Sequence, residues 1–106
     1  MYFDFEAGNK QYKLRLNTRN TVALEKALGC NPLSIFGAGD TIPTITTMVT
    51  ILWASLQQYH HGISLNDAYD IFDSYLEEHS ATDFIPVILE IYKVSGIIRD
   101  GATEKN

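Results

Sequence analysis

The start of the chain alternates between apolar and polar residues in two short runs. Residues 1–6 place Met and Phe on one side and Tyr, Asp and Glu on the other, and residues 11–16 repeat the alternation. A period of two is typical of a strand with one covered face, and residues 7–10 between the runs carry Gly and Asn, which favour turns. We therefore predict a β-hairpin over residues 1–16. The side chains expected to face a core are Phe3, Phe5, Tyr12, Leu14 and Leu16.

After the hairpin the apolar spacing becomes helical. Asn17 or Thr18 can cap a helix that runs to Leu28, and Gly29 supplies the left-handed residue that often ends a helix. Residues 31–36 then predict a short helical piece with a proline near its start.

Two longer helices follow. Residues 44–58 and residues 64–77 each repeat apolar side chains at the spacing of one helical face. Gly62 separates the two segments, and Ser64 with Asp67 three residues later has the spacing of a capping box. The sequence therefore predicts two helices joined by a short turn.

The last long stretch, residues 80–98, is apolar in nearly every helical direction. A helix of this kind must be covered on several sides. Its length, with Pro86 and Gly96 inside it, indicates a core helix and not a membrane span. We predict that it begins at Ser80 or Thr82 and that the other segments pack around it.

These elements predict an α+β fold that is mainly α: an N-terminal β-hairpin followed by a small bundle of three principal helices and one or two short helical pieces. We expect a single domain over residues 1–99, with the hairpin at 1–16 and the helical body at 17–99. Residues 37–40 are expected to form a mobile surface loop, and residues 100–106 a flexible polar tail.

Charge is distributed unevenly along the chain, whose formal net charge is -5. Residues 1–26 hold five Lys or Arg against three acids, whereas residues 27–92 hold eight acids and no Lys or Arg. An acidic body repels phosphates, which argues against a nucleic-acid partner. It is compatible with a basic or an apolar protein partner.

Composition indicates a globular protein of a reducing compartment. Hydrophobic residues make up 45% and charged residues 20% of the chain, which is ordinary for a folded domain. Cys30 is the one cysteine, so an intramolecular disulfide is excluded and a cytoplasmic location is favoured. No basic segment followed by an apolar run opens the chain, and we expect neither export nor membrane association.

Candidate chemical groups are few. His60 and His61 are adjacent, so on a helix they point about 100° apart, and no Cys or nearby His at i+4 completes a metal site. His79 stands alone, and Cys30 has no base or orienting group that the sequence can place beside it. We predict no catalytic, cofactor or metal site, and no enzymatic activity.

Four carboxylates lie along one predicted helix, at Asp67, Asp70, Asp73 and Glu77. A calcium site needs oxygens clustered on a tight loop, whereas these follow a helix flank. Two interpretations remain: a solvated helix face, or a docking surface for a basic partner.

Aromatic content points to an interface. Six Tyr and one Trp in a chain of 106 residues are more than one small core hides completely. Some of these rings should form an exposed apolar patch, which usually marks a protein interface. The patch could bind a different protein or a second copy of this chain.

The order of several segments resembles a known family. These are residues 14–16 leading into 22–33 (VALEKALGCNPL), then 51–57 (ILWASLQ), 61–63 (HGI) and 83–87 (DFIPV). Together they are similar to the tail assembly chaperones of long-tailed phages and prophages of Gram-positive bacteria. The resemblance runs from about residue 12 to residue 98.

This resemblance implies a non-enzymatic role in the cytoplasm of the bacterial host. Such chaperones bind the tape measure protein, a very long, apolar, helix-forming chain, and keep it soluble until tail tube subunits polymerise around it. The chaperone is then displaced and is absent from the mature virion. In many phages a frameshifted longer form also recruits tail tube protein. The alternatives are a structural head-tail connector or completion protein retained in the virion, and a small regulatory domain that binds a host protein.

A partner helix would lie against exposed aromatic side chains of the chaperone, in the helix-in-groove manner. The residues predicted to contact the partner are Trp53, Tyr59, Tyr69, Phe72 and Tyr75.

Overall fold

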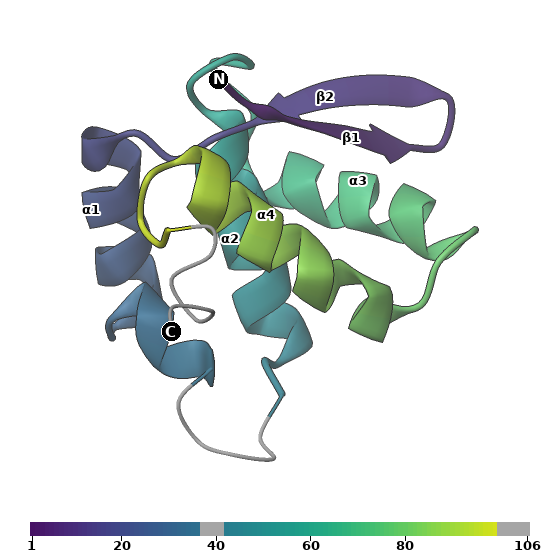
Figure 1. Ribbon diagram of the computed structural model, residues 1–106. Coiled ribbons are helices and arrows are strands. Elements are labelled where there is room, and N and C mark those ends of the chain that lie inside the picture. The colour runs from purple at the N-terminus through teal and green to yellow at the C-terminus, as the bar shows by residue number, and fades with distance from the viewer. Residues whose placement is uncertain (37–41, 100–106) are drawn as a thin grey trace.

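The computed structural model describes residues 1–36 and 42–99 (Figure 1). A two-stranded antiparallel hairpin precedes four α-helices and two short 3-10 helices over these residues, so the predicted α+β, mainly α fold is confirmed. The elements in chain order are β1 (Phe3–Ala7), β2 (Lys10–Leu14), α1 (Thr18–Leu28), η1 (Pro32–Phe36), α2 (Ile45–Leu56), α3 (Leu65–Leu76), η2 (Ala81–Asp83) and α4 (Phe84–Val94). The predicted loop at 37–40 and tail at 100–106 lie outside the described residues.

The hairpin turns tightly at Gly8 and Asn9, because Ala7 and Lys10 are already paired across the strands. Gly8 has φ 66° and Asn9 has no positive φ, the pattern of a type II′ turn with glycine in the first loop position. The predicted inner face is confirmed. Phe5, Leu14 and Leu16 are buried, and Phe3 and Tyr12 are partly buried against the same core.

Helix ends follow the capping signals of the sequence. Asn17 caps α1 by accepting from the Asn20 N–H at 2.8 Å, and Gly29 ends it with φ 74°. Ser64 and Asp67 form the expected capping box of α3. At 11 residues α1 is as long as α4, so it counts with the principal helices and not with the short pieces.

The predicted helix over residues 80–98 is divided in the structure. Ser80 caps the short helix η2 through a second capping box, and α4 begins only at Phe84. Pro86 therefore falls in the first turn of α4, where a missing N–H breaks no helical bond. Gly96, with φ 79°, follows directly after the C-cap Ser95, so the helix stops at Val94.

Helix α2 is the most enclosed element, ahead of α4. Residues 48–56 are buried apart from Trp53, whereas α4 buries Phe84, Ile88, Ile91 and Tyr92. Helix α2 can be enclosed because its buried hydroxyls are hydrogen-bonded within the helix. The Thr50 hydroxyl donates to the Thr46 carbonyl, and the Ser55 hydroxyl donates to the Leu52 carbonyl. It contacts α1, α3, α4 and β2.

Four aromatic rings join the hairpin to α3 and α4. Phe5, Phe72, Tyr75 and Phe84 contact one another with ring centroids 5.0 to 6.0 Å apart. Such tilted and edge-to-face pairs each add about 1 kcal/mol to the burial of the rings. The hairpin is therefore held by the core of the helical body, as an isolated hairpin would need.

None of the helices in the part of the chain that the structure describes is both long enough and apolar enough to cross a membrane.

Candidate functional site

Helix α3 carries a groove lining, a set of carboxylates and an exposed apolar row. Its buried side carries Ala68, Phe72 and Tyr75 and packs on the hairpin and α4. The rest of its circumference has three parts: a side that faces the hairpin across a groove, the carboxylates that form the rim of this groove, and a row of exposed apolar residues.

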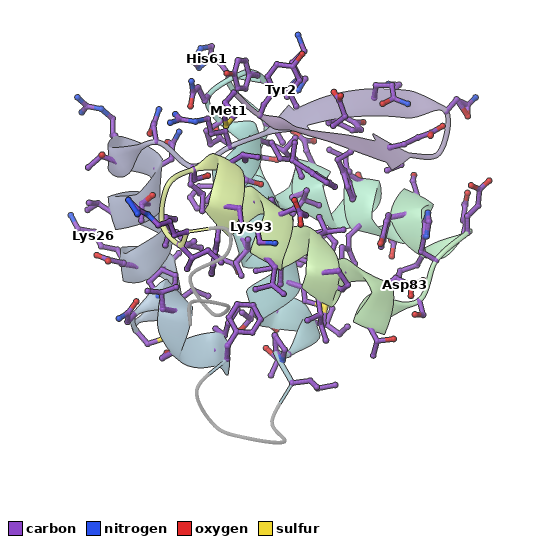
Figure 2. The ribbon with its side chains drawn as sticks, in the orientation of Figure 1. Met1, Tyr2, Lys26, His61, Asp83 and Lys93 are labelled. Atoms are coloured by element: carbon purple, nitrogen blue, oxygen red, sulfur yellow. The ribbon has the colours of Figure 1, made fainter. Side chains whose placement is uncertain are left out.

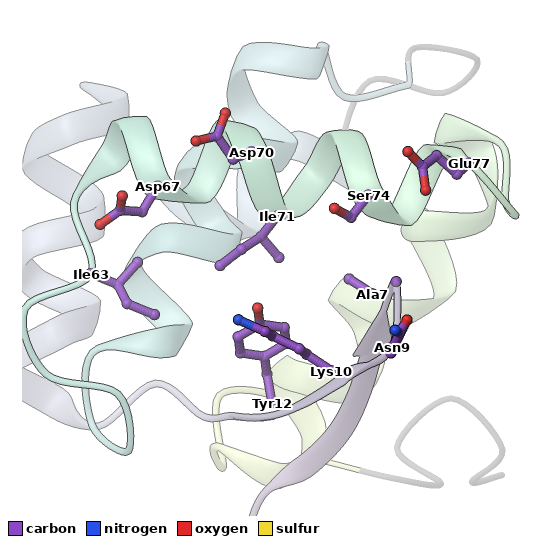
Figure 3. A pocket seen from close by; sticks show the side chains of 11 residues that line it. Ala7, Asn9, Lys10, Tyr12, Ile63, Asp67, Asp70, Ile71, Ser74 and Glu77 are labelled. Atoms are coloured by element: carbon purple, nitrogen blue, oxygen red, sulfur yellow. The ribbon is translucent and has the colours of Figure 1, made fainter.

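The groove side faces the hairpin (Figure 3). An open groove of about 910 Å³ lies between α3 and the β1–β2 turn. Ile63 and Ile71 point toward Tyr12 and form its apolar floor. Burial of Tyr12 raises the pKa of its phenol. The remaining lining residues are Ala7, Gly8, Asn9, Lys10, Asp67, Asp70, Ser74 and Glu77.

The groove has a negative rim. Asp67, Asp70 and Glu77 line it from α3, and Lys10 is the one cation among the lining residues. Asp67 is engaged in the capping box, but the ion pairs of the described residues do not include Asp70 or Glu77. These two carboxylates are therefore open to a positively charged partner.

The third part of α3 is an apolar row formed by Leu65, Tyr69 and Leu76, which we call the α3 stripe. Their exposed fractions are 39%, 44% and 38%. Successive helix residues are rotated by roughly 100°, so the three side chains fall within a sector of roughly 40°. Asp73 is exposed beside the stripe and, with Asp70 and Glu77, separates it from the groove.

The remaining predicted contact residues have different surroundings. Trp53 is partly buried and lines a hollow of about 510 Å³ between α1 and α2, among the amides of Asn17, Asn20 and Gln57. Tyr59 is 37% exposed and packs edge-on against Tyr2, with ring centroids 5.4 Å apart. Of the five residues, only Tyr69 belongs to an exposed apolar row.

Phe72 and Tyr75 belong to the core. Their exposed fractions are 2% and 4%, and both rings contact Phe84. A partner that binds the folded domain cannot reach them, so we revise their predicted role from partner contact to support of the hairpin. Helical spacing placed Phe72 on the same apolar face as Tyr69 and Tyr75 at the flank of that face.

Sequence reasoning missed Leu65, Leu76 and the groove. The two leucines belong to the apolar face of residues 64–77, and apolar residues at helical spacing normally mark a core. The groove depends on Ile63, Ile71 and Tyr12 meeting across the gap between α3 and the hairpin. A local sequence pattern cannot predict that these distant segments lie side by side.

His60 is held against the second strand of the hairpin. The Nε2 atom of His60 accepts a hydrogen bond from the Lys13 N–H at 2.9 Å, and its ring packs edge-on against Tyr12. Burial, and then the charge of Lys13, lower the pKa of His60. Tyr2 and His61 lie at this same end of the molecule (Figure 2). Within residues 1–36 and 42–99, no group of three His, Cys, Asp or Glu is placed to hold a metal ion.

Comparison with known proteins adds no relative: no protein-family model, curated protein or solved structure matches this chain.

Proposed function

We propose that this protein is a tail assembly chaperone of a long-tailed phage or prophage, which binds the tape measure protein and keeps it soluble until the tail tube polymerises. The observation that carries the proposal is the α3 stripe, an exposed apolar row on a stable helix. The resemblance over residues 12–98 supplies the identity of the partner. The role is non-enzymatic and belongs to the host cytoplasm before the virion is complete.

The α3 stripe would cover an apolar stripe of the tape measure helix. Complete burial of a large apolar side chain is worth about 2 to 3 kcal/mol. Leu65, Tyr69 and Leu76 are each about 40% exposed, so each has roughly 1 kcal/mol left to gain. Three such contacts, about 3 kcal/mol together, fall short of the roughly 4 to 15 kcal/mol of translational and rotational freedom that association costs. A single copy therefore binds weakly.

Weak binding by each copy suits this function. Many copies along one long client gain from effective concentration, while each remains displaceable by incoming tube subunits. The exposed carboxylate of Asp73 beside the stripe would remain in water and help to keep the coated client soluble. Recruitment of tube subunits is assigned to a longer form of the protein, as the resemblance implies.

Co-expression tests the proposal. The tape measure candidate is the long, apolar, helix-forming protein encoded nearby, and it is produced with and without this chain. We expect it to be soluble and to co-purify with this chain only when the two are produced together. Unchanged solubility with no co-purification would remove the chaperone function. Mass spectrometry of purified particles then separates it from the connector alternative, because a chaperone is missing from the particle.

A further inference from the structure

We propose that the groove between α3 and the hairpin binds helix α1 of a second copy of this chain, so that copies associate head to tail. This contact uses the groove side of α3 and leaves the α3 stripe free, so it does not depend on the proposed function.

The outer face of α1 is a basic and apolar ridge. Arg19, Val22, Ala23 and Lys26 lie together on it, at the i, i+3, i+4 and i+7 positions of a single helical face. Val22 is 43% exposed, and Lys26 points outward from α1 in Figure 2. This ridge places one apolar side chain between two cations.

The groove matches that ridge in charge and in spacing. Arg19 and Lys26 are separated by two helical turns, about 10.5 Å along the axis, and so are Asp70 and Glu77. An antiparallel approach brings Arg19 to Glu77 and Lys26 to Asp70. Val22 then lies level with Ser74, about 4.5 Å along the axis from Ile71, which carries the apolar floor of the groove.

The two surfaces cannot meet within one molecule. Helix α1 packs on α2, and α3 packs on α2 and β1, so α1 and α3 lie on different sides of α2 (Figure 1). A contact between two different surfaces is heterologous, and it produces a ring or an open filament according to the rotation between copies. Lys10, on the hairpin side of the groove, would repel the basic ridge. The ridge should therefore contact the opposite side of the groove, where the carboxylates of α3 lie.

Charge reversal tests this contact in the full chain. Sedimentation velocity over micromolar to millimolar protein should show a mass that rises with concentration and falls with added salt. Arg19→Glu with Lys26→Glu should weaken association at least about tenfold, and so should Asp70→Lys with Glu77→Lys, because each change replaces two attractions by two repulsions. Lys10→Glu should strengthen association.

Mixing the two reversed proteins is the decisive step. Each has like charges on both surfaces and stays monomeric alone, but the unchanged groove of one fits the unchanged ridge of the other. We expect association to return in the equimolar mixture. All four side chains are exposed, and circular dichroism melting curves verify that the variants fold. A wild-type chain that stays monomeric throughout, or a mixture no more associated than its components, would overturn the proposal.

Discussion

The hydroxyl of Tyr92 makes a buried hydrogen bond between segments that are 60 residues apart in the chain. It donates to the Pro32 carbonyl at 3.0 Å and thereby joins α4 to η1. The ring is completely buried, and burial, with a smaller contribution from Cys30, raises the pKa of the phenol far above its usual range. At this position a tyrosine specifies where η1 sits, whereas a phenylalanine would only fill the space.

Tyr92→Phe should lower the free energy of unfolding by about 1 to 2 kcal/mol, because the buried Pro32 carbonyl loses its donor. Urea unfolding followed by circular dichroism measures the change. Tyr69→Phe removes a hydroxyl from a side chain that is 44% exposed, so this control should change stability little. Equal stability of Tyr92→Phe and the wild type would show that the hydrogen bond contributes nothing.

His60 makes stability depend on pH. Burial, and then the charge of Lys13, lower the pKa of His60 in the folded chain below its unfolded value. The neutral ring accepts a hydrogen bond from the Lys13 N–H through Nε2. Above about pH 6.5 both states are neutral and the contact is fully present. As pH falls below that value the unfolded chain binds the proton first, and stability is lost until the folded ring also titrates.

We therefore expect His60→Gln, whose amide oxygen can replace Nε2 as acceptor, to flatten the fall in melting temperature between about pH 7.5 and 5.5. The neighbouring exposed His61→Gln is the matched control and should keep the wild-type slope. A His60→Gln slope as steep as that of the wild type would assign the pH dependence to other groups.

At the scale of elements, the hairpin and the helix ends were predicted from local sequence patterns, because interactions within a few residues determine them. The alternation in residues 1–16 gave the hairpin, and Asn17, Gly29 and Ser64 marked helix ends because their caps satisfy backbone groups within a few residues. The end of α4 was placed too late because its apolar run continues past Gly96, whose positive φ stops the helix. The part of each helix that becomes buried depends on the tertiary arrangement and not on the local sequence.

Helix α3 illustrates why part of the site escaped prediction. Leu65, Tyr69, Phe72 and Leu76 share one apolar pattern, and nothing in their spacing says which side the hairpin will cover. The ring cluster around Phe84 fixes that choice, burying Phe72 and Tyr75 and leaving the other three exposed. Exposure on this helix is thus a property of the tertiary arrangement.

The hairpin turn offers a test at this scale. Gly8→Ala should lower the free energy of unfolding by about 1 kcal/mol, because Gly8 has φ 66° and a side chain is strained there. The added Cβ would lie 3.6 Å from the Ser74 Cβ, an ordinary contact, so crowding is not the cause. Asn9→Ala, at the neighbouring loop position without a positive φ, should cost less in the same denaturation experiment. Equal losses would argue against strain at Gly8.

At the scale of the whole molecule, charge and apolar surface are separated. Arg19 and Lys26 lie on α1, Asp70 and Asp73 lie on α3, and the α3 stripe borders these two carboxylates. A domain built this way can hold a client through the stripe while its other surfaces stay in water or meet further copies. In the proposed function, client binding thus belongs to one side of one helix.

The most direct test of that assignment is Tyr69→Asp in the co-expression experiment with the tape measure candidate. The matched control is Asn66→Asp, which adds the same charge to another exposed position of α3. Both variants should keep the wild-type helical circular dichroism. We expect Tyr69→Asp to reduce the soluble client to the amount found without this chain, and Asn66→Asp to preserve it. A folded Tyr69→Asp protein that still keeps the client soluble would contradict the account.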